Sequence, residues 1–369
     1  MDSLAGIRCV AILLIVFSHL SSYIPGVSNY GIGANGVSLF IFLSGFLVAY
    51  THISRHSGKN PIKWAVSYTK KKLGSFYFLN LIMFIAALLL LSASAIYSNS
   101  VTGEWMVTMI TNGLLNLTLL QSWVPDSSVY FSYNAVAWYL SITVFFYLMT
   151  PFIFHFLKKI NTRVKMTGLI VSIFFIELIW TLIFGNTAFA HAMIYVFPAY
   201  RLLEFILGCA FGKMFIERKM NETGISKRIN RKRFTLLEFT AVLAFTFAVL
   251  AFTFAVLAWP HIPVAFGYSV FYVPFTVFLI YTFAFGRGLI SKIIANPVML
   301  FISVISFEIF LIHQTVIRYL DAASSFVPLY DAAFVILALA ITVISSYLAH
   351  KYLPRIQRRL VEMYKVHFC

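Results

Sequence analysis

Ten long apolar runs constrain what this chain can fold into. Each run approaches or exceeds the roughly 20 residues that a helix needs to cross a bilayer. The runs are continuous and do not alternate with polar residues, which favours helices over a barrel. The ten runs are Gly6–Tyr23, Gly33–Ile53, Leu73–Tyr97, Ala135–Leu157, Met166–Gly185, Ala192–Phe215, Leu236–Leu257, Val264–Phe285, Val298–Tyr319 and Ala332–Tyr352.

Composition agrees with this interpretation, because only 11% of the residues are charged. Soluble domains carry about 25%. We therefore expect an all-α fold, a polytopic integral membrane bundle of about ten transmembrane helices that forms a single domain over residues 1–369.

The basic residues predict how the bundle is oriented. All but three of the 28 lysines and arginines fall in the even-numbered loops and the C-terminal tail. The odd-numbered loops hold none of them and carry acidic residues, namely Glu104, Asp126, Asp321 and Asp331. The positive-inside rule then places both termini and every even-numbered loop in the cytoplasm. Because the basic residues are divided among separate loops, the net charge of +16 indicates topology and not nucleic-acid binding.

Arg8 and His19 share the first apolar run. Eleven helical positions amount to about three turns plus 20°, so both side chains point the same way, about 16 Å apart along the axis. Ionisable groups inside a bilayer are costly and are by default candidates for a functional site. We therefore interpret this pair as the first candidate site.

Other charged groups also lie within the spans. Arg201 and Glu204 are three residues apart and can pair on one helix face, either as a buried structural ion pair or as part of a binding site. Glu308 and His313 are separated by roughly 140° around a helix, so we do not expect them to touch. Arg318 is expected to extend toward the outer surface.

Two further segments and the cysteines carry weaker signals. The stretch 106–124 is moderately apolar but rich in Asn, Gln and Thr, and we interpret it as an interfacial or re-entrant outer segment. The sequence Ala-Phe-Thr-Phe-Ala-Val-Leu occurs at 244–250 and again at 251–257, and we expect this charge-free helix to face lipid. Cys9, Cys209 and Cys369 form no disulfide or metal-binding framework, so we expect no metal site.

The opening block from Leu4 to Arg8, followed by His19, resembles the arginine–ten residues–histidine motif of the acyltransferase-three family of bacterial integral-membrane O-acyltransferases. The resemblance extends in family order over nearly the whole chain, and the family's ten-helix core matches the number of spans. It implies one membrane acyltransferase domain over residues 1–369. The four later blocks are Gly36–Phe46, Ala137–Tyr147, Arg201–Gly208 and Ile305–Gln314.

The chain also departs from the family pattern. Ser38 stands where many members have aspartate, and Thr143 where many have glutamate. A catalytic role of either acid therefore does not carry over, and any acid that assists His19 would be Glu204 or Glu308. The run Lys70–Lys72 stands where the family more often has a run that contains arginine and proline. These lysines either bind CoA phosphates or only keep their loop in the cytoplasm.

The resemblance implies transfer of an acyl group, usually acetyl from acetyl-CoA, to a hydroxyl of a surface glycan or lipid-linked saccharide such as O-antigen. Acetyl-CoA would be a donor substrate, with no bound cofactor. His19 suits the general base, and Arg8, at the cytoplasmic end, suits the anionic donor. The expected partners are acetyl-CoA, the saccharide acceptor and membrane lipid, with no nucleic acid. The expected location is the bacterial inner (plasma) membrane, crossed several times.

Alternatives stay open for several residues and for the function. His313 belongs either to the site or to a structural polar contact, and Ser141 is either a nucleophile or a helix-packing residue. With Arg201, Glu204 and Glu308, they are the candidates for donor or substrate binding. The alternative function is a secondary transporter of a small anionic or sugar-like solute. Against it, the chain shows no inverted repeat and no matching pair of Gly/Pro-broken spans; a membrane scaffold or sensor would not need the Arg8–His19 pair.

The charge distribution predicts the location of four loop or tail positions. Reporter fusions after Lys72, Lys165, Arg233 and Cys369 should all report a cytoplasmic location, because the basic residues around them resist translocation. An external signal at any one of these positions contradicts the ten-span topology.

Overall fold

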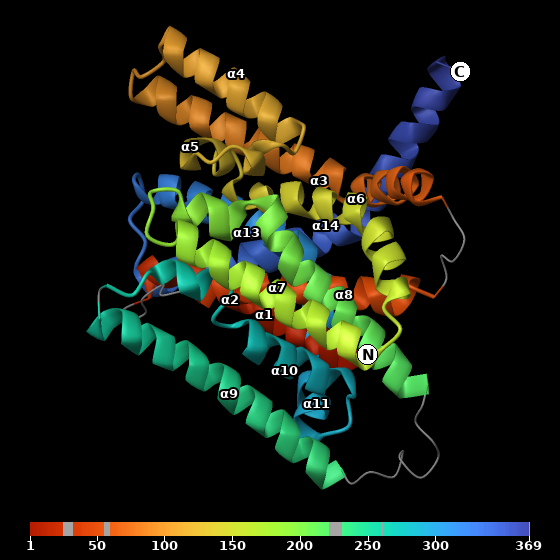
Figure 1. The fold of residues 1–369 in the computed structure, drawn as a ribbon. Helices are drawn as coiled ribbons and strands as arrows, with labels where there is room; N and C mark the ends of the chain where they lie inside the picture. Colours follow the sequence, from red (N-terminus) through yellow and green to blue (C-terminus); the bar gives the residue numbers. More distant parts are fainter. Residues whose placement is uncertain (25–31, 55–59, 221–230, 260, 369) are drawn as a thin grey trace. The chain divides into compact units, whose positions relative to one another are not determined.

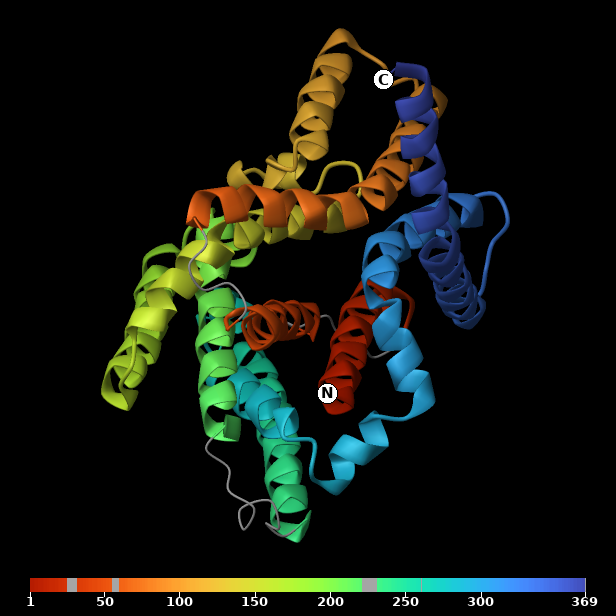
Figure 2. The same cartoon turned by 90° about the vertical axis from the view of Figure 1, so that its right-hand side faces the viewer.

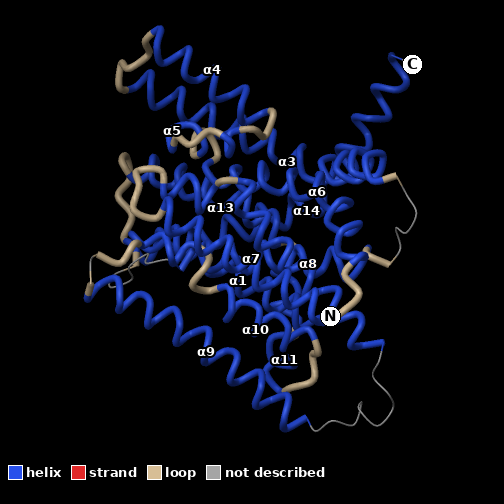
Figure 3. The backbone as a smooth tube through the Cα atoms, in the orientation of Figure 1, coloured by secondary structure: helices blue, strands red, loops and turns tan. Residues whose placement is uncertain are grey.

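The structure, a computed structural model, describes residues 1–24, 32–54, 60–220, 231–259 and 261–368, with side chains up to residue 358. Across these ranges the backbone consists of helices and loops and contains no strand (Figure 3). Several basic residues used in the topology prediction lie outside the described residues or side chains, as does Cys369. They are Arg55, Lys59, Lys227, Arg228, Arg359 and Lys365.

The expected all-α membrane fold is confirmed. Within the described ranges, nine helices are long and apolar enough to cross a membrane, or ten if one bent pair counts as a single span. The nine candidate spans are Asp2–Tyr23, Ile32–His52, Pro61–Tyr97, Ala135–Lys159, Arg163–Phe184, His191–Met220, Arg231–Ala258, Val264–Ala284 and Asp331–Arg358.

Three of the expected spans are less regular than their sequences indicated. The run Val298–Tyr319 is broken at Ile305 into α12 (Pro297–Val304) and α13 (Ser306–Ser324). The sixth span begins as a π-helical segment, η4 (His191–Val196), before α8 (Pro198–Met220). The eighth span begins with the 3₁₀ turn η6 (Val264–Tyr268) before α10 (Val273–Ala284). The hydropathy of a run depends only on its length and its apolar residues, so it does not reveal where the helix is interrupted.

The chain divides into two compact units. Unit 1 comprises Met1–Ser18, Asn29–Val66 and Phe145–Val304, and unit 2 comprises His19–Ser28, Ser67–Val144 and Ile305–Cys369. The first helix, α1 (Asp2–Leu20), contributes its first 17 residues to unit 1 and its last two to unit 2.

In unit 1, α2 (Ile32–His52) and α8 pack closely along their lengths. A Cβ at Gly45 would clash with the Phe205 carbonyl oxygen, and a Cβ at Gly208 would clash with that of Phe42. Small residues at such crossings let backbones approach, which is a common way for helices to associate in membranes. These two glycines therefore allow the close approach of α2 to α8, which carries Arg201 and Glu204.

The repeated sequence lies in α9 (Arg231–Ala258), alongside α10 and α11 (Leu289–Ile294) (Figure 1). Phe245 and Phe252 occupy the same position in the two copies and are buried, and the ring of Phe252 lies 5.8 Å from that of Tyr272. Phe247 and Phe254, which also correspond, are 71% and 67% exposed. The seven-residue spacing thus gives α9 one packed face and one exposed face, whereas the sequence indicated only the exposed one.

Glu238, on α9, fastens the start of α11. The side chain is fully buried, and its carboxylate accepts hydrogen bonds from the backbone N–H groups of Gly288 (2.8 Å) and Ser291 (2.9 Å) and from the Ser291 hydroxyl (2.5 Å). The first N–H groups of a helix have no partners within the helix, and an acidic group there is favourable.

In unit 2, α13 packs along α14 (Asp331–Phe368), and both appear as blue helices in Figure 2. The segment expected to be interfacial forms α4 (Gly103–Leu117) and the turn η2 (Gln121–Trp123), and it is not among the candidate spans. Its buried amides bind neighbouring groups, because Asn112 donates to the Ser128 carbonyl and Gln121 to that of Ala137. These bonds satisfy the amides that are buried in a stretch whose other residues are largely exposed.

Arg318, which we expect to extend toward the outer surface, finds its partner in the segment that precedes the span Ala135–Lys159. It is half-buried, and its Nη1 donates to the Tyr133 carbonyl at 2.5 Å. A nearby backbone acceptor therefore holds the guanidinium within unit 2.

Replacing Glu238 by alanine should destabilise the protein by about 3 kcal/mol, because the buried donors at the start of α11 lose a charged acceptor. Glu217→Ala is the control. Its carboxylate is exposed and lies 3.4 Å from the Lys213 ammonium, so the change should cost less than about 1 kcal/mol. The measurement is the unfolding free energy of the purified protein in detergent, and equal losses in the two variants would contradict this role.

Candidate functional site

In each unit, a cluster of polar side chains lies within the described parts of the membrane-spanning helices. In unit 1 the cluster is centred on Arg201, which is fully buried. Its Nη1 donates to Glu204 Oε2 at 3.0 Å, and its Nε donates to the Tyr195 carbonyl at 2.8 Å. The predicted pairing of Arg201 with Glu204 on one helix face is therefore present.

The second carboxylate oxygen of Glu204 also accepts hydrogen bonds. Oε1 accepts from the Ser38 hydroxyl at 2.8 Å and from the Ser269 hydroxyl at 2.5 Å. An aspartate at position 38 could donate such a bond only in its protonated form. The serine that departs from the family pattern is thus a donor suited to the carboxylate beside it.

The irregular start of the sixth span shapes this cluster. The π-helical segment η4 ends at Phe197, which is extended, and Pro198 then begins α8. The Tyr195 carbonyl of η4 accepts from Arg201, and the Tyr195 ring lies 5.0 Å from the guanidinium carbon. π-Helical turns are frequent at functional sites, and this one supplies both an acceptor and an aromatic face.

Glu177 extends the charge cluster and was not predicted as a site residue. It lies on α7 (Arg163–Phe184), is fully buried, and interacts electrostatically with Glu204 and Arg201. Among the described side chains, its two carboxylate oxygens have no hydrogen-bond partner. The sequence did carry one signal for Glu177, because it is an acidic residue in the middle of an apolar run. The sequence could not show which charged residues it lies near, because Arg201 and Glu204 belong to another helix.

Arg8 is half-buried in unit 1, on α1. It lies within electrostatic range of Tyr147, on α6 (Trp138–Lys159). Because residues 2–20 form one uninterrupted helix, Arg8 and His19 have the shared face and the separation of about 16 Å that their spacing predicted.

In unit 2 the cluster is a histidine pair. The ring centroids of His19 and His313 lie 5.1 Å apart, with an interplanar angle of 51°. His19 is exposed although Ser18 and Leu20 beside it are buried, whereas His313 is fully buried. Positions 19 and 313 are far apart in the sequence, and the structure brings the two histidines together.

The environment of His313 determines which nitrogen carries its proton. Nδ1 lies 2.9 Å from the Ile309 carbonyl, which can only accept a hydrogen bond. We therefore assign the proton of the neutral ring to Nδ1, which leaves a lone pair on Nε2. Nε2 is buried, and none of the described groups bonds to it.

The end of α1 is fastened to the helices that surround His313. After His19 the chain forms the turn η1 (Ser21–Tyr23), and the Tyr23 hydroxyl donates to Asp321 Oδ1 at 2.6 Å. The Tyr23 ring stacks on that of Phe334 with centroids 3.8 Å apart. These two contacts to α13 and α14 hold His19 beside α13.

The remaining predicted residues of unit 2 are Glu308 and Ser141. Glu308 Oε1 lies 2.8 Å from His350 Nδ1, on α14, in agreement with the spacing argument that it would not touch His313. His350 was missed, because no local spacing links it to Glu308. The Ser141 hydroxyl is buried without a hydrogen-bond partner among the described groups, so no base is bonded to it as a nucleophile would require.

The polar clusters and the arrangement of spans define a polytopic membrane protein with ionisable groups inside the bilayer. Residues 1–351 match the family described as an acyltransferase domain, so the chain belongs to that family, as the sequence blocks predicted. Acyltransferase MdmB of Streptomyces mycarofaciens is 26% identical over 173 residues, which cover 44% of this chain and 41% of MdmB. The chain thus spans about two fifths of this curated relative's length. No solved structure matches the chain.

Breaking the Arg201–Glu204 pair should lower the amount of folded protein. Glu204→Ala leaves the buried Arg201 without its counter-charge, which costs about 3–5 kcal/mol. The double variant Arg201→Met with Glu204→Leu should recover part of the loss, since it removes both partners of the ion pair together. The measurement is the abundance of monodisperse protein extracted from membranes. An abundant but inactive Glu204→Ala variant would instead assign Glu204 a direct role in the reaction.

Proposed function

We propose that this chain is a membrane-bound O-acyltransferase of the bacterial inner membrane. It moves an acyl group, most often acetyl, from cytoplasmic acetyl-CoA to a hydroxyl of a surface glycan or lipid-linked saccharide. The observation that carries the proposal is the His19–His313 pair within membrane-spanning helices, with the imidazole of His19 exposed. The family to which the chain belongs supports the reaction class.

The reaction requires one proton transfer at the acceptor. The hydroxyl oxygen attacks the thioester carbonyl, a C–O bond forms, the C–S bond breaks, and the hydroxyl proton must leave. His19 accepts this proton as the general base and returns it to the departing thiolate. His313, fixed by Ile309 and packed against the His19 ring, is a positioning residue that limits how this ring can turn.

We assign Arg8 to binding of the acyl donor, acetyl-CoA. It lies about three turns before His19 on the same face of α1, toward the end that the positive-inside rule places in the cytoplasm. A guanidinium binds phosphate oxygens through two parallel hydrogen bonds. We therefore assign Arg8 to the phosphates of the CoA thioester, with the acyl end directed toward the depth of His19.

The runner-up function is a secondary transporter of a small anionic or sugar-like solute. Interrupted helices are typical of transporter binding sites, and the break between α12 and α13 is such an interruption. Membership of the acyltransferase-domain family favours the enzyme. Radiolabelled acetyl-CoA incubated with membranes separates the two, because an enzyme incorporates the label into saccharide and a carrier accumulates a solute unchanged.

His19→Ala should lower acyl transfer by about 10²–10⁴-fold while the protein inserts at normal abundance, because general-base catalysis is lost. His155→Ala, which removes an exposed histidine from α6, is the control and should retain full activity. Arg8→Lys should also lose activity, because lysine keeps the charge but lacks the planar pair of donors. Binding of acetyl-CoA should weaken in Arg8→Lys and persist in His19→Ala. Near-normal transfer by His19→Ala would refute the mechanism.

A further inference from the structure

The break at Ile305 separates α13, which carries His313, from the helix that precedes it. Because the helix is interrupted there, the chain alone does not fix how α13 is rotated or how deep it lies. Contacts with its neighbours in unit 2 must do so. One such neighbour is the segment that joins the outer helix α4 to the span Ala135–Lys159.

Two consecutive residues of this segment, Tyr133 and Asn134, bind α13, and we call them the α13 clamp. Asn134 Nδ2 donates to the Leu311 carbonyl at 2.9 Å. The Tyr133 carbonyl accepts from Arg318 Nη1. Leu311 and Arg318 are seven positions apart on α13, which is about two turns, so both bonds lie on one face of the helix.

Tyr133 has a backbone conformation that few residues adopt. Its φ of 56° lies in the left-handed region, where an L side chain is strained. Such strain persists only where surrounding contacts hold it. The Tyr133 hydroxyl donates to the Met109 carbonyl of α4 at 2.5 Å, and its ring stacks on that of Phe84 with centroids 4.3 Å apart. Because Phe84 belongs to α3 (Pro61–Tyr97), the α13 clamp is anchored to both α3 and α4.

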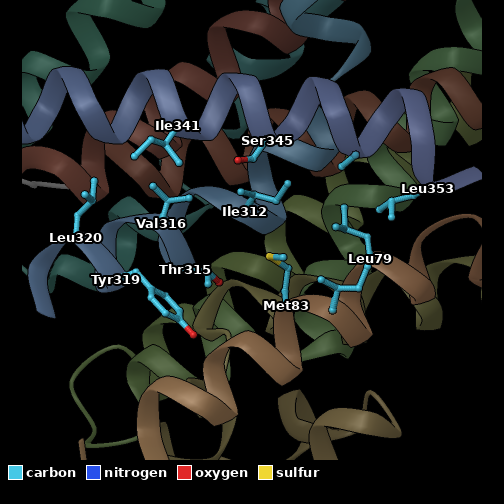
Figure 4. A pocket seen from close by; sticks show the side chains of 12 residues that line it. Leu79, Met83, Ile312, Thr315, Val316, Tyr319, Leu320, Ile341, Ser345 and Leu353 are labelled. Atoms are coloured by element: carbon cyan, nitrogen blue, oxygen red, sulfur yellow. The ribbon is translucent and has the colours of Figure 1, made fainter. Parts of the chain in front are cut away.

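A third bond joins α13 to α3 directly. The Tyr319 hydroxyl donates to the Ala86 carbonyl of α3 at 2.7 Å. Figure 4 shows the Tyr319 side chain extending from α13 with its hydroxyl directed away from α14. Together with the α13 clamp, this bond fastens the stretch of α13 from position 311 to position 319 to α3 and to the outer segment.

The α13 clamp and the histidine pair lie on opposite sides of α13. His313 follows Leu311 by two positions, which is about 200° around a helix. On its own side of α13, His313 contacts the ring of His19. A shift of the helix at the α13 clamp would therefore move the His313 ring relative to that of His19.

We propose that Asn134 is a positioning residue for acyl transfer, because its bond to α13 keeps His313 against the His19 ring. This proposal rests on the proposed function, in which His19 is the general base. The Asn134 side chain is only 3% exposed, and its amide oxygen has no hydrogen bond to any described group. The Leu311 carbonyl can only accept, so it requires the amide nitrogen. Asn134 therefore acts on the reaction through α13.

Asn134→Asp tests this bond with a side chain of the same shape, because it replaces the amide donor with an oxygen that the carbonyl repels. A misplacement of about 1 Å can cost 10²-fold in rate, so kcat per folded protein should fall by about tenfold or more. KM for acetyl-CoA and for the saccharide should stay near the wild-type values, since neither binding site is altered. Asn134→Leu removes the donor without adding a charge and should give the same result.

Asn112→Asp is the matched control. Asn112 is also a buried amide of the outer segment, and its Nδ2 donates to the Ser128 carbonyl at 3.0 Å. That bond stays within the outer segment and does not reach α13, so its loss should leave kcat per folded protein near the wild-type value. Equal values of kcat in Asn112→Asp and Asn134→Asp would overturn the proposal.

A double-mutant cycle shows whether Asn134 acts through His313. His313→Ala removes the ring that the α13 clamp is proposed to hold, and it should itself lower kcat. Adding Asn134→Asp to His313→Ala should then lower kcat no further. Losses that multiply in the double variant would refute the proposal, because they would give Asn134 a route to the reaction that does not pass through His313.

Chemical modification separates this proposal from the one on which it rests. Diethyl pyrocarbonate reacts with accessible histidine nitrogens, and His313 is fully buried in the wild type. Mass spectrometry should find His313 unmodified in the wild type and in Asn112→Asp, but modified in Asn134→Asp. Protection of His313 in all three proteins overturns the role of Asn134 alone. Modification in Asn134→Asp without any acyl transfer by the wild type overturns the proposed function, and with it the catalytic role of the α13 clamp.

Discussion

The hydrocarbon of the bilayer offers no hydrogen bonds, so polar groups in the spans depend on partners within the protein. Arg201 shows this dependence most clearly, because it is fully buried and binds both a carboxylate and a backbone carbonyl. Glu204, in turn, accepts from two serines in addition to Arg201. The close approach of α2 to α8 and the irregular turn before α8 both serve to bring these partners together.

The histidine pair departs from this rule in an informative way. His19 is exposed, His313 has a buried ring nitrogen with no bond to the described groups, and Thr315, two residues on, has a hydroxyl in the same condition. All three belong to unit 2 and lie at the end of α1 or on α13. Unpartnered atoms alone do not separate the two clusters, because Arg201 Nη2 and both Glu177 carboxylate oxygens are also buried without a hydrogen bond to a described group. We assign chemistry to the histidines because the exposed ring of His19 lies against a second ring that a backbone carbonyl holds in place, and structure to Arg201 and Glu204 because they form a fully buried ion pair.

Local sequence predicted what depends on local geometry. Apolar run length predicted the spans, and the intervals of three and eleven residues predicted the Arg201–Glu204 pair and the shared face of Arg8 and His19. The contact of His19 with His313 joins helices far apart in the sequence, so no spacing argument reaches it. The same holds for His350 beside Glu308 and for Glu238 at the start of α11. The break at Ile305 was missed because an apolar run is equally hydrophobic whether its helix is continuous or bent.

The central claim is that this protein attaches acyl groups to saccharide, and the product tests it most directly. Mass spectrometry of surface and lipid-linked saccharides should be compared between cells that carry the gene and otherwise identical cells that lack it. The account predicts an ester-linked acyl group, removed by mild alkali, in the first sample and its absence in the second. Identical saccharides in both samples, combined with altered uptake of a small solute, would contradict the account and favour a transporter.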